Sequence, residues 1–320
     1  MKVPRSFLLL LLLLTVASAC KRQQSGSTTL VAARKNFHTK LLPQKREIEP
    51  VEVAPTNVFL TVKYPAANGR FQFPAYLTPD PADGKKHPAI VWITGGDCNS
   101  IGDVWSPAPR DNDQTAAAYR KAGVIMMFPS LRGGNDNPGT KEGFLGEVDD
   151  VIAAAKFLQT QPYVDPNRVY LGGHSTGGTL ALLVSECSSS LFRAVFAFGP
   201  VADVAAYGSD RDFVPVNLRD RREIRPRSPG YWLNSIQSPT WVLEGTEEAN
   251  TASLRIMARI CKNPKVRFVE IKNATHFDGL APINEFIARQ ILQDTKPTCS
   301  INLAPSDVSR HFAASSKATQ

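Results

Sequence analysis

The chain has 320 residues, 42% of them hydrophobic and 21% charged, so a substantial core can form in one large domain or two smaller ones. Its formal net charge is +8 at pH 7, from 37 basic and 29 acidic residues. The excess is diffuse apart from an arginine cluster between Arg211 and Arg227, and no pattern there suits a DNA groove. Nucleic acid is therefore not expected as a partner, and an anionic envelope surface or substrate fits the charge better.

The first twenty residues have the pattern of an export signal. Lys2 and Arg5 precede an apolar run at 7–14 that is too short to span a bilayer, and small residues then form a cleavage site before Cys20. We expect residues 1–19 to be removed as a signal peptide, which leaves 35 basic against 29 acidic residues, a net charge of +6. Cys20 resembles the acylated cysteine of bacterial lipoproteins, although alanine stands three residues before it where leucine is usual. Simple secretion is the alternative, with cleavage at the same bond.

Composition divides the mature chain into three parts. Residues 20–56 are polar and lack sustained periodicity, which predicts a flexible tether. A folded domain is expected at 57–294, followed by a small and polar tail at 295–320 that is predicted to be disordered. Lys21 stands where an aspartate usually retains a lipoprotein at the inner membrane. By resemblance we expect a lipid-anchored protein of the outer membrane or cell surface, if the source is Gram-negative, or else a periplasmic or secreted one.

Within the domain, predicted strands and helices alternate. Apolar alternation around Asn68-Gly69 predicts an antiparallel hairpin from strands 58–62 and 71–77. Continuous apolar runs predict strands covered on both faces, and stripes of helical period lie between them. The further strands are expected at 88–93, 123–129, 169–171, 194–198, 239–245 and 266–271, and the helices at 115–121, 147–158, 180–184, 253–261 and 283–292. This order predicts an α/β fold, with a mainly parallel sheet, right-handed crossovers and helices on both faces.

One strand runs directly into a helix through Gly173-x-Ser175-x-Gly177. A serine at the apex of such a turn is the pattern of a nucleophile elbow, in which the hydroxyl is held above the sheet in a strained conformation. The glycines are needed because neighbouring Cβ atoms would not fit so tight a turn. The start of the following helix offers backbone N–H groups to a developing anion.

Six elements in order resemble the α/β-hydrolase superfamily, and within it the catalytic domains of prolyl-oligopeptidase-like and dienelactone-hydrolase-like enzymes. They are Thr94-Gly95-Gly96 in place of His-Gly-Gly, the Arg-Gly loop at 131–134, the lead-in at 164–168, the elbow, Ser238-Pro239-Thr240, and the loop Asn273–Phe277. The resemblance covers residues 58–292 and implies an α/β-hydrolase fold with a Ser-acid-His triad in that chain order.

The resemblance assigns the triad. Ser175 is the expected nucleophile and His276, after the last strand, the expected base. The other four histidines lie in the tether, in the tail, before a strand, or beside Ser175 on a turn that directs the side chain away. Family spacing places the acid at Glu248, three residues past Gly245, with Glu247 as the alternative.

The oxyanion hole needs two donors on one oxygen. The N–H of Thr176 is expected to be one, and the turn at 95–97 to supply the other, from Gly96. The family's histidine is replaced by Thr94, so support for this loop must come from elsewhere. Arg132 either fixes the neighbouring loop or is an exposed arginine.

Four cysteines remain after signal removal: Cys98, Cys187, Cys261 and Cys299. Their spacing matches no metal motif, and we expect neither a metal nor a cofactor. An oxidising envelope permits a disulfide, for which Cys261 with Cys299 is the first pair to test. Cys187, in the helix after the elbow, is expected to be a small buried hydrophobe.

The sequence indicates the substrate class less directly than it indicates the triad. The family's oligopeptidases carry a large propeller ahead of the hydrolase domain, which the short polar segment before residue 57 cannot form. The insertion 200–238 is cap-like, and its arginines either recognise an acidic group or form a solvated basic face. We expect a small ester or acyl substrate, with two alternatives: a prolyl-oligopeptidase-type peptidase acting on short peptides, and a non-catalytic envelope lipoprotein that binds its ligand.

Overall fold

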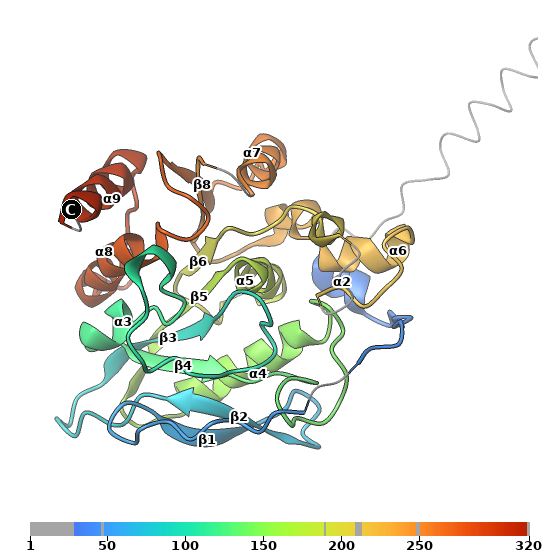
Figure 1. The fold of residues 1–320 in the computed structure, drawn as a ribbon, viewed down its shortest axis with the longest axis horizontal. Coiled ribbons are helices and arrows are strands. Elements are labelled where there is room, and N and C mark those ends of the chain that lie inside the picture. The colour runs from blue at the N-terminus through green and yellow to red at the C-terminus, as the bar shows by residue number, and fades with distance from the viewer. Residues whose placement is uncertain (1–28, 46–47, 189, 209–212, 248–249, 319–320) are drawn as a thin grey trace, which may run out of the picture.

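The computed structural model describes residues 29–45, 48–188, 190–208, 213–247 and 250–318 (Figure 1). Within these residues one eight-stranded sheet has the order β1-β2-β4-β3-β5-β6-β7-β8. The strands are β1 (Leu60–Pro65), β2 (Gln72–Leu77), β3 (His87–Ile93), β4 (Ile125–Pro129), β5 (Val164–His174), β6 (Val195–Phe198), β7 (Thr240–Gly245) and β8 (Val266–Ile271). β2 pairs antiparallel with β1 and β4, and the other neighbours are parallel. The structure confirms the predicted sheet and its opening hairpin.

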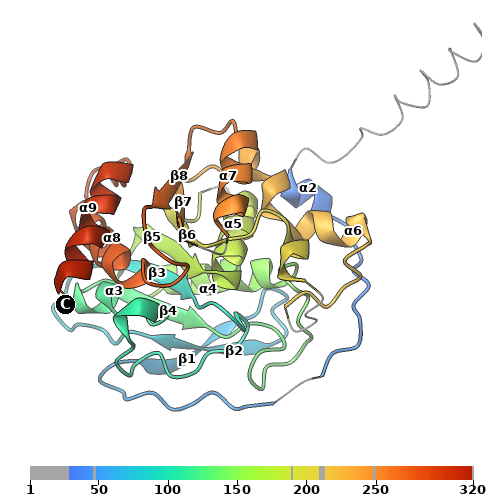
Figure 2. The same ribbon diagram turned by 45° about the horizontal axis from the view of Figure 1, so that its top comes forward.

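Helices cover both faces of the sheet, as Figures 1 and 2 show. One face carries α4 (Glu147–Gln159), α5 (Thr176–Cys187) and α7 (Thr251–Ile260), and the other carries α3 (Ala118–Lys121), α8 (Leu280–Gln293) and α9 (Pro305–Ala318). In β3, Val91 packs with the core beneath α4 and α5, whereas Ile90 and Trp92 pack with the core beneath α8. Side chains alternate across a strand, so burial on both faces makes the central strands continuously apolar.

The segment before the first strand is packed on the domain from Thr29 onward. Helix α2 (Leu30–Arg34) buries Leu30 completely in the core with α4 and α5. Arg34 forms an ion pair of 2.7 Å with Asp149 of α4, and Ala54 is buried in the core on the opposite face. The flexible tether expected at 20–56 is therefore wrong for residues 29–45 and 48–56, while 20–28 lie outside the described residues. A few anchoring side chains in a polar segment give no periodic signal.

The chain after α8 is also ordered, contrary to the predicted disordered tail. Ile301 and Leu303 are buried ahead of α9, and Val308 and Phe312 are buried within it. These two lie four residues apart, on one face of the helix, and pack on the core of α8. The other positions of α9 are mostly polar, so the average composition concealed a one-sided helix.

The described residues of the insertion 200–238 form a run of short helices beside α5. They are η2 (Val204–Tyr207), α6 (Arg221–Ile224), η3 (Arg225–Arg227), η4 (Pro229–Tyr231) and η5 (Leu233–Ser235), and a further short helix, η1 (Arg110–Asn112), lies before α3. Figures 1 and 2 both place α6 beside α2. Ile224 and Trp232 belong to the core that α4 and α5 share.

The arginines of this insertion have different environments. Arg227 is completely buried and forms an ion pair of 2.9 Å with Glu223. Arg225 is exposed and lies over the rings of Tyr231 and Trp232, 5.4 and 5.0 Å from their centroids. Arg211 lies outside the described residues. Arg227 and Arg225 therefore stabilise the insertion through their contacts, and the exposed Arg225 also makes its surface positively charged.

All four cysteines in the described part of the chain are free. Cys261 packs against a core that contains Ala197 and Val242, while Cys299 packs against one that contains Phe196 and Trp241. The two residues from each strand are consecutive, and consecutive side chains of a strand point to opposite faces of the sheet. The two cysteines therefore lie on opposite faces, and the pairing expected first is wrong. In the same part of the chain, no helix has the length and apolar character needed to cross a membrane.

Candidate active site

Ser175 lies between the last residue of β5 and the first residue of α5. Its backbone is left-handed, with φ 56° and ψ −115°, an unusual conformation for a residue with a side chain. Glycine is required on both sides of the turn. A Cβ added at Gly173 would lie 2.5 Å from the carbonyl oxygen of Gly177, and one added at Gly177 would lie 2.3 Å from that of Ile93. The serine hydroxyl is thus presented by the strained turn that the sequence predicted.

His276 follows β8, in the loop before α8, and it has a buried carboxylate partner. Its Nδ1 lies 3.0 Å from Oε2 of Glu244, and the two side chains are 10% and 1% exposed. The other oxygen of Glu244 accepts a hydrogen bond of 2.8 Å from the N–H of Gly245. A carboxylate held on Nδ1 fixes the imidazole tautomer, so that Nε2 is the nitrogen that can take a proton from a nucleophile.

The acid expected from family spacing is a different residue, Glu248, and that assignment stays a prediction. Glu248 lies outside the described part of the chain. Glu247 is exposed, and its carboxylate accepts a hydrogen bond of 3.3 Å from the hydroxyl of Thr246. Sequence reasoning overlooked Glu244, although a signal was present. It is a charged residue inside the apolar strand β7, and a buried carboxylate requires a partner.

Gly199, directly after β6, provides the space in which this pair meets. Its φ is +60°, and an added Cβ would lie 2.3 Å from Cε1 of His276 and 2.9 Å from Oε2 of Glu244. The carbonyl of Gly199 accepts a hydrogen bond of 2.7 Å from the side chain of Asn250, at the start of α7. Three strand ends, those of β6, β7 and β8, therefore build the environment of the imidazole.

The loop after β3 and the start of α5 contain Gly96 and Thr176, the two residues that the sequence predicts as oxyanion donors. The N–H of Gly95 donates to Oε1 of Gln114 at 3.0 Å, so it is not available to a substrate. The hydroxyl of Thr176 donates to the carbonyl of Gly96 at 2.8 Å, which fixes this loop against the start of α5. As the first residue of a helix, Thr176 has an N–H without an intrahelical acceptor. These contacts are compatible with the predicted pair of donors, the N–H groups of Gly96 and Thr176.

His174, next to the nucleophile, is completely buried. Its Nδ1 lies 2.8 Å from Nε2 of Gln114, and its Nε2 lies 2.9 Å from the backbone carbonyl of His276. Burial, together with the neighbouring His276, lowers the pKa of His174 to about 3. Both ring nitrogens are thus engaged away from Ser175, and His174 is not the base.

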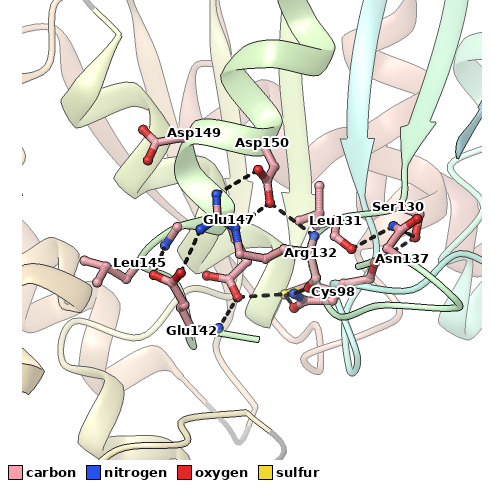
Figure 3. A network of polar contacts seen from close by, with 12 residues as sticks. Cys98, Ser130, Leu131, Arg132, Asn137, Glu142, Leu145, Glu147, Asp149 and Asp150 are labelled. Atoms are coloured by element: carbon pink, nitrogen blue, oxygen red, sulfur yellow. Dashed lines mark hydrogen bonds and ion pairs between the residues drawn. The ribbon is translucent and has the colours of Figure 1, made fainter. Parts of the chain in front are cut away.

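Arg132 belongs to a network of polar contacts that anchors the loops beside the site (Figure 3). Its Nε and Nη2 donate to the two oxygens of Asp150 at 2.8 and 2.9 Å, and its Nη1 donates to Glu142 at 2.7 Å. The side chain of Asn99 donates to the carbonyl of Arg132 at 2.8 Å and to Glu147 at 3.2 Å. Of the two alternatives for Arg132, the structure therefore supports loop fixation, and the network joins the loop after β3 to α4.

No group of three or more His, Cys, Asp or Glu side chains in the described residues could hold a metal ion. Instead, the described site has an elbow serine, a buried glutamate and a histidine after the last strand, in the chain order Ser-acid-His. That order on a mainly parallel sheet defines an α/β-hydrolase with a serine nucleophile.

Comparison with known proteins agrees with this class. Residues 111–240 match the sequence model of the prolyl oligopeptidase family. The uncharacterized peptidase YtmA of Bacillus subtilis is 24% identical over 186 residues, which are 55% of this chain and 69% of YtmA. The dual function macrocyclase-peptidase POPB of Galerina marginata is 34% identical over 126 residues, 37% of this chain and 16% of that protein.

Among solved structures, dipeptidyl peptidase 4 of Porphyromonas gingivalis superposes with a TM-score of 0.59 at 19% identity, over 74% of this chain and 35% of that one. The chain therefore spans most of YtmA but a much smaller part of the longer relatives. The fold, the site and these similarities together indicate a serine hydrolase with the α/β-hydrolase fold.

Proposed function

We propose that this protein hydrolyses an ester or a small acyl or peptide substrate through an acyl-enzyme on Ser175. The observation that carries the proposal is the bond of 3.0 Å between His276 Nδ1 and the buried Glu244, formed in a fold that also presents Ser175 on a strained elbow. A serine hydroxyl is a weak nucleophile without a base, and a neutral imidazole oriented by a carboxylate is the base that such sites use.

In the proposed reaction, Ser175 Oγ attacks the substrate carbonyl while His276 Nε2 takes the hydroxyl proton. The negative carbonyl oxygen is stabilised by the N–H groups of Thr176 and Gly96. The tetrahedral intermediate collapses, His276 donates the proton to the leaving alcohol or amine, and the acyl group stays on Ser175. Water then attacks the acyl-enzyme with His276 again acting as base, which releases the acid. Glu244 stabilises the imidazolium in both halves of the reaction.

The proposal covers two classes of substrate, in which the acyl bond is either an ester or a peptide bond. The match to the prolyl oligopeptidase family and the similarity to the peptidases YtmA and POPB support a peptidase of the prolyl-oligopeptidase type as the second candidate. Comparing kcat/KM for p-nitrophenyl acetate and for a blocked Gly-Pro p-nitroanilide distinguishes them. Preference for the ester supports the first candidate, and preference for the anilide supports the second.

The location is also a proposal, carried by the sequence around Cys20. We infer export, cleavage before Cys20 and lipid attachment at its thiol. Several acyl chains hold a protein firmly on a membrane, whereas one gives only marginal binding. Because the chain is packed on the domain from Leu30, such an anchor would keep the domain close to the membrane surface. Wild type is expected in the detergent phase on fractionation, and Cys20→Ala in the aqueous phase or unprocessed. A native, unmodified soluble protein that begins at residue 20 would establish ordinary secretion instead.

A fluorophosphonate probe tests the central proposal, since it reacts with activated serines. Wild type should be labelled and Ser175→Ala should not. The matched control is Ser106→Ala, which removes an exposed hydroxyl elsewhere and should leave labelling unchanged. If wild type showed neither labelling nor turnover of either substrate, the non-catalytic alternative would be favoured.

A further inference from the structure

Three side-chain contacts connect the two loops that the proposed mechanism uses. Gln114 accepts from the N–H of Gly95 through Oε1, at 3.0 Å. Its Nε2 lies 2.8 Å from Nδ1 of His174, and Nε2 of His174 lies 2.9 Å from the backbone carbonyl of His276. The oxyanion loop after β3 is thereby joined to the loop of the base after β8, by way of the residue that precedes the nucleophile.

The polarity of this chain of bonds is determined at both ends. The N–H of Gly95 can only donate, so it must face the amide oxygen of Gln114, and the amide nitrogen then faces His174. Nδ1 of His174 must therefore accept. At the other end, the carbonyl of His276 can only accept, so Nε2 of His174 must carry the proton. All three bonds form only when His174 is neutral and protonated on Nε2, and burial favours its neutral form.

We propose that His174 and Gln114 are positioning residues, which hold the oxyanion loop and the base loop in a fixed relation through this one-way chain of hydrogen bonds. The proposal rests on the proposed function, which gives the two loops their roles. Gln114 anchors the N–H of Gly95, while Thr176 anchors the carbonyl of Gly96 at 2.8 Å. The peptide between these two anchors carries the N–H of Gly96, the second oxyanion donor. Gln114 thus supports the loop in which Thr94 replaces the family's histidine.

Packing around the chain of bonds supports the same role. The rings of His174 and His276 lie 4.5 Å apart between centroids, and Phe277 contacts both, at 5.4 and 4.9 Å. At the opposite end, a Cβ added at Gly95 would lie 2.9 Å from Nδ1 of His174 and 3.3 Å from Oε1 of Gln114. The side chains therefore fill the space between the loops, with no room for a larger residue at Gly95.

NMR of the full chain labelled with ¹⁵N-histidine tests the arrangement without any substrate. The His174 signal, assigned by its loss in His174→Phe, is expected to be that of a neutral ring with the proton on Nε2 at neutral pH. In Gln114→Glu, a carboxylate keeps the acceptor for Gly95 but cannot donate to His174, so His174 should take a second proton. A cationic ring or an Nδ1–H tautomer in wild type would overturn the proposal, and this holds even if the protein hydrolyses nothing.

Kinetics with p-nitrophenyl acetate test the positioning role. His174→Phe and Gln114→Leu should each lower kcat by about 10- to 100-fold, the effect expected for slightly misplaced reacting groups, and change KM little. His87→Phe, at the first residue of β3, and Gln237→Leu, just before β7, are matched controls because the site follows the other ends of these strands. Both variants should retain wild-type kcat. Gln114 is only partly buried, so thermal unfolding should show that Gln114→Leu is folded. Wild-type kcat in Gln114→Leu would overturn the proposal.

Discussion

Changing Glu244 to glutamine tests which carboxylate orients His276. The two oxygens of Glu244 accept from different donors, the N–H of Gly245 at 2.8 Å and Nδ1 of His276 at 3.0 Å. An amide has only one oxygen. If that oxygen faces Gly245, the amide nitrogen faces His276, and the imidazole must move its proton to Nε2. In that tautomer His276 cannot accept the proton of Ser175.

The expected magnitude follows from this change of tautomer. The corresponding acid-to-amide change in a serine protease lowers kcat about 10⁴-fold. This corresponds to roughly 5 kcal/mol of transition-state stabilisation, at about 1.4 kcal/mol for each factor of ten. With its side chain 1% exposed, Glu244 is well shielded from water, so solvent is not expected to replace the lost acceptor. We therefore expect a loss of about 10³- to 10⁴-fold for Glu244→Gln.

The assay is turnover of p-nitrophenyl acetate, with Glu247→Gln and Glu248→Gln measured beside it. Both comparison variants should stay within a few-fold of wild type, because Nδ1 of His276 already has its acceptor. Circular dichroism and thermal unfolding should confirm that Glu244→Gln is folded. The reasoning is refuted if Glu248→Gln is inactive and Glu244→Gln retains activity, because the family position would then supply the acid.

Three further predictions address the site and the core. Ser175→Ala and His276→Ala should each reduce turnover by several orders of magnitude, and the double variant little further, because the members of a triad act as a unit; additive losses in this cycle would contradict that. Gly199→Ala should abolish fluorophosphonate labelling in a folded protein, since its Cβ would lie 2.3 Å from His276, whereas Gly102→Ala, whose Cβ meets nothing within 4 Å, should be labelled normally. Burial raises the pKa of Glu186 well above its usual value, so the folded chain keeps a proton that the unfolded chain releases, and stability falls as pH rises above the unfolded pKa. Glu186→Gln should therefore gain melting temperature relative to wild type as the pH rises above about 4.5, and a pH-independent difference would argue against this assignment.

Most of the sheet could be predicted because each strand is marked by a pattern in its own few residues. β3 and β4 are covered on both faces, so their residues form continuous apolar runs, and the turn at Asn68-Gly69 marks the antiparallel hairpin. The elbow could be found for the same reason. Its glycines lie within a few residues of each other, and at each of them an added Cβ would clash with a backbone carbonyl.

Contacts between distant segments could not be read from the sequence. Glu244 and His276 meet because β7 and β8 are neighbours in the sheet, whereas family spacing indicated the loop after Gly245. The same holds for the ends of the chain. Leu30 and Phe312 belong to short apolar stretches within largely polar segments, and their packing against α5 and α8 explains why these segments are ordered.

The buried glutamates show why Glu244 is the carboxylate suited to catalysis. Neither oxygen of Glu186 has a hydrogen-bond partner among the described residues, and one oxygen of Glu147 also lacks one. Burial raises the pKa of both groups, which favours their neutral forms. Each oxygen of Glu244 instead accepts from an N–H group, one of them from the imidazole. Of these three buried carboxyl groups, Glu244 is the one that contacts the base directly, and its two hydrogen bonds hold the carboxylate in position to orient the imidazole.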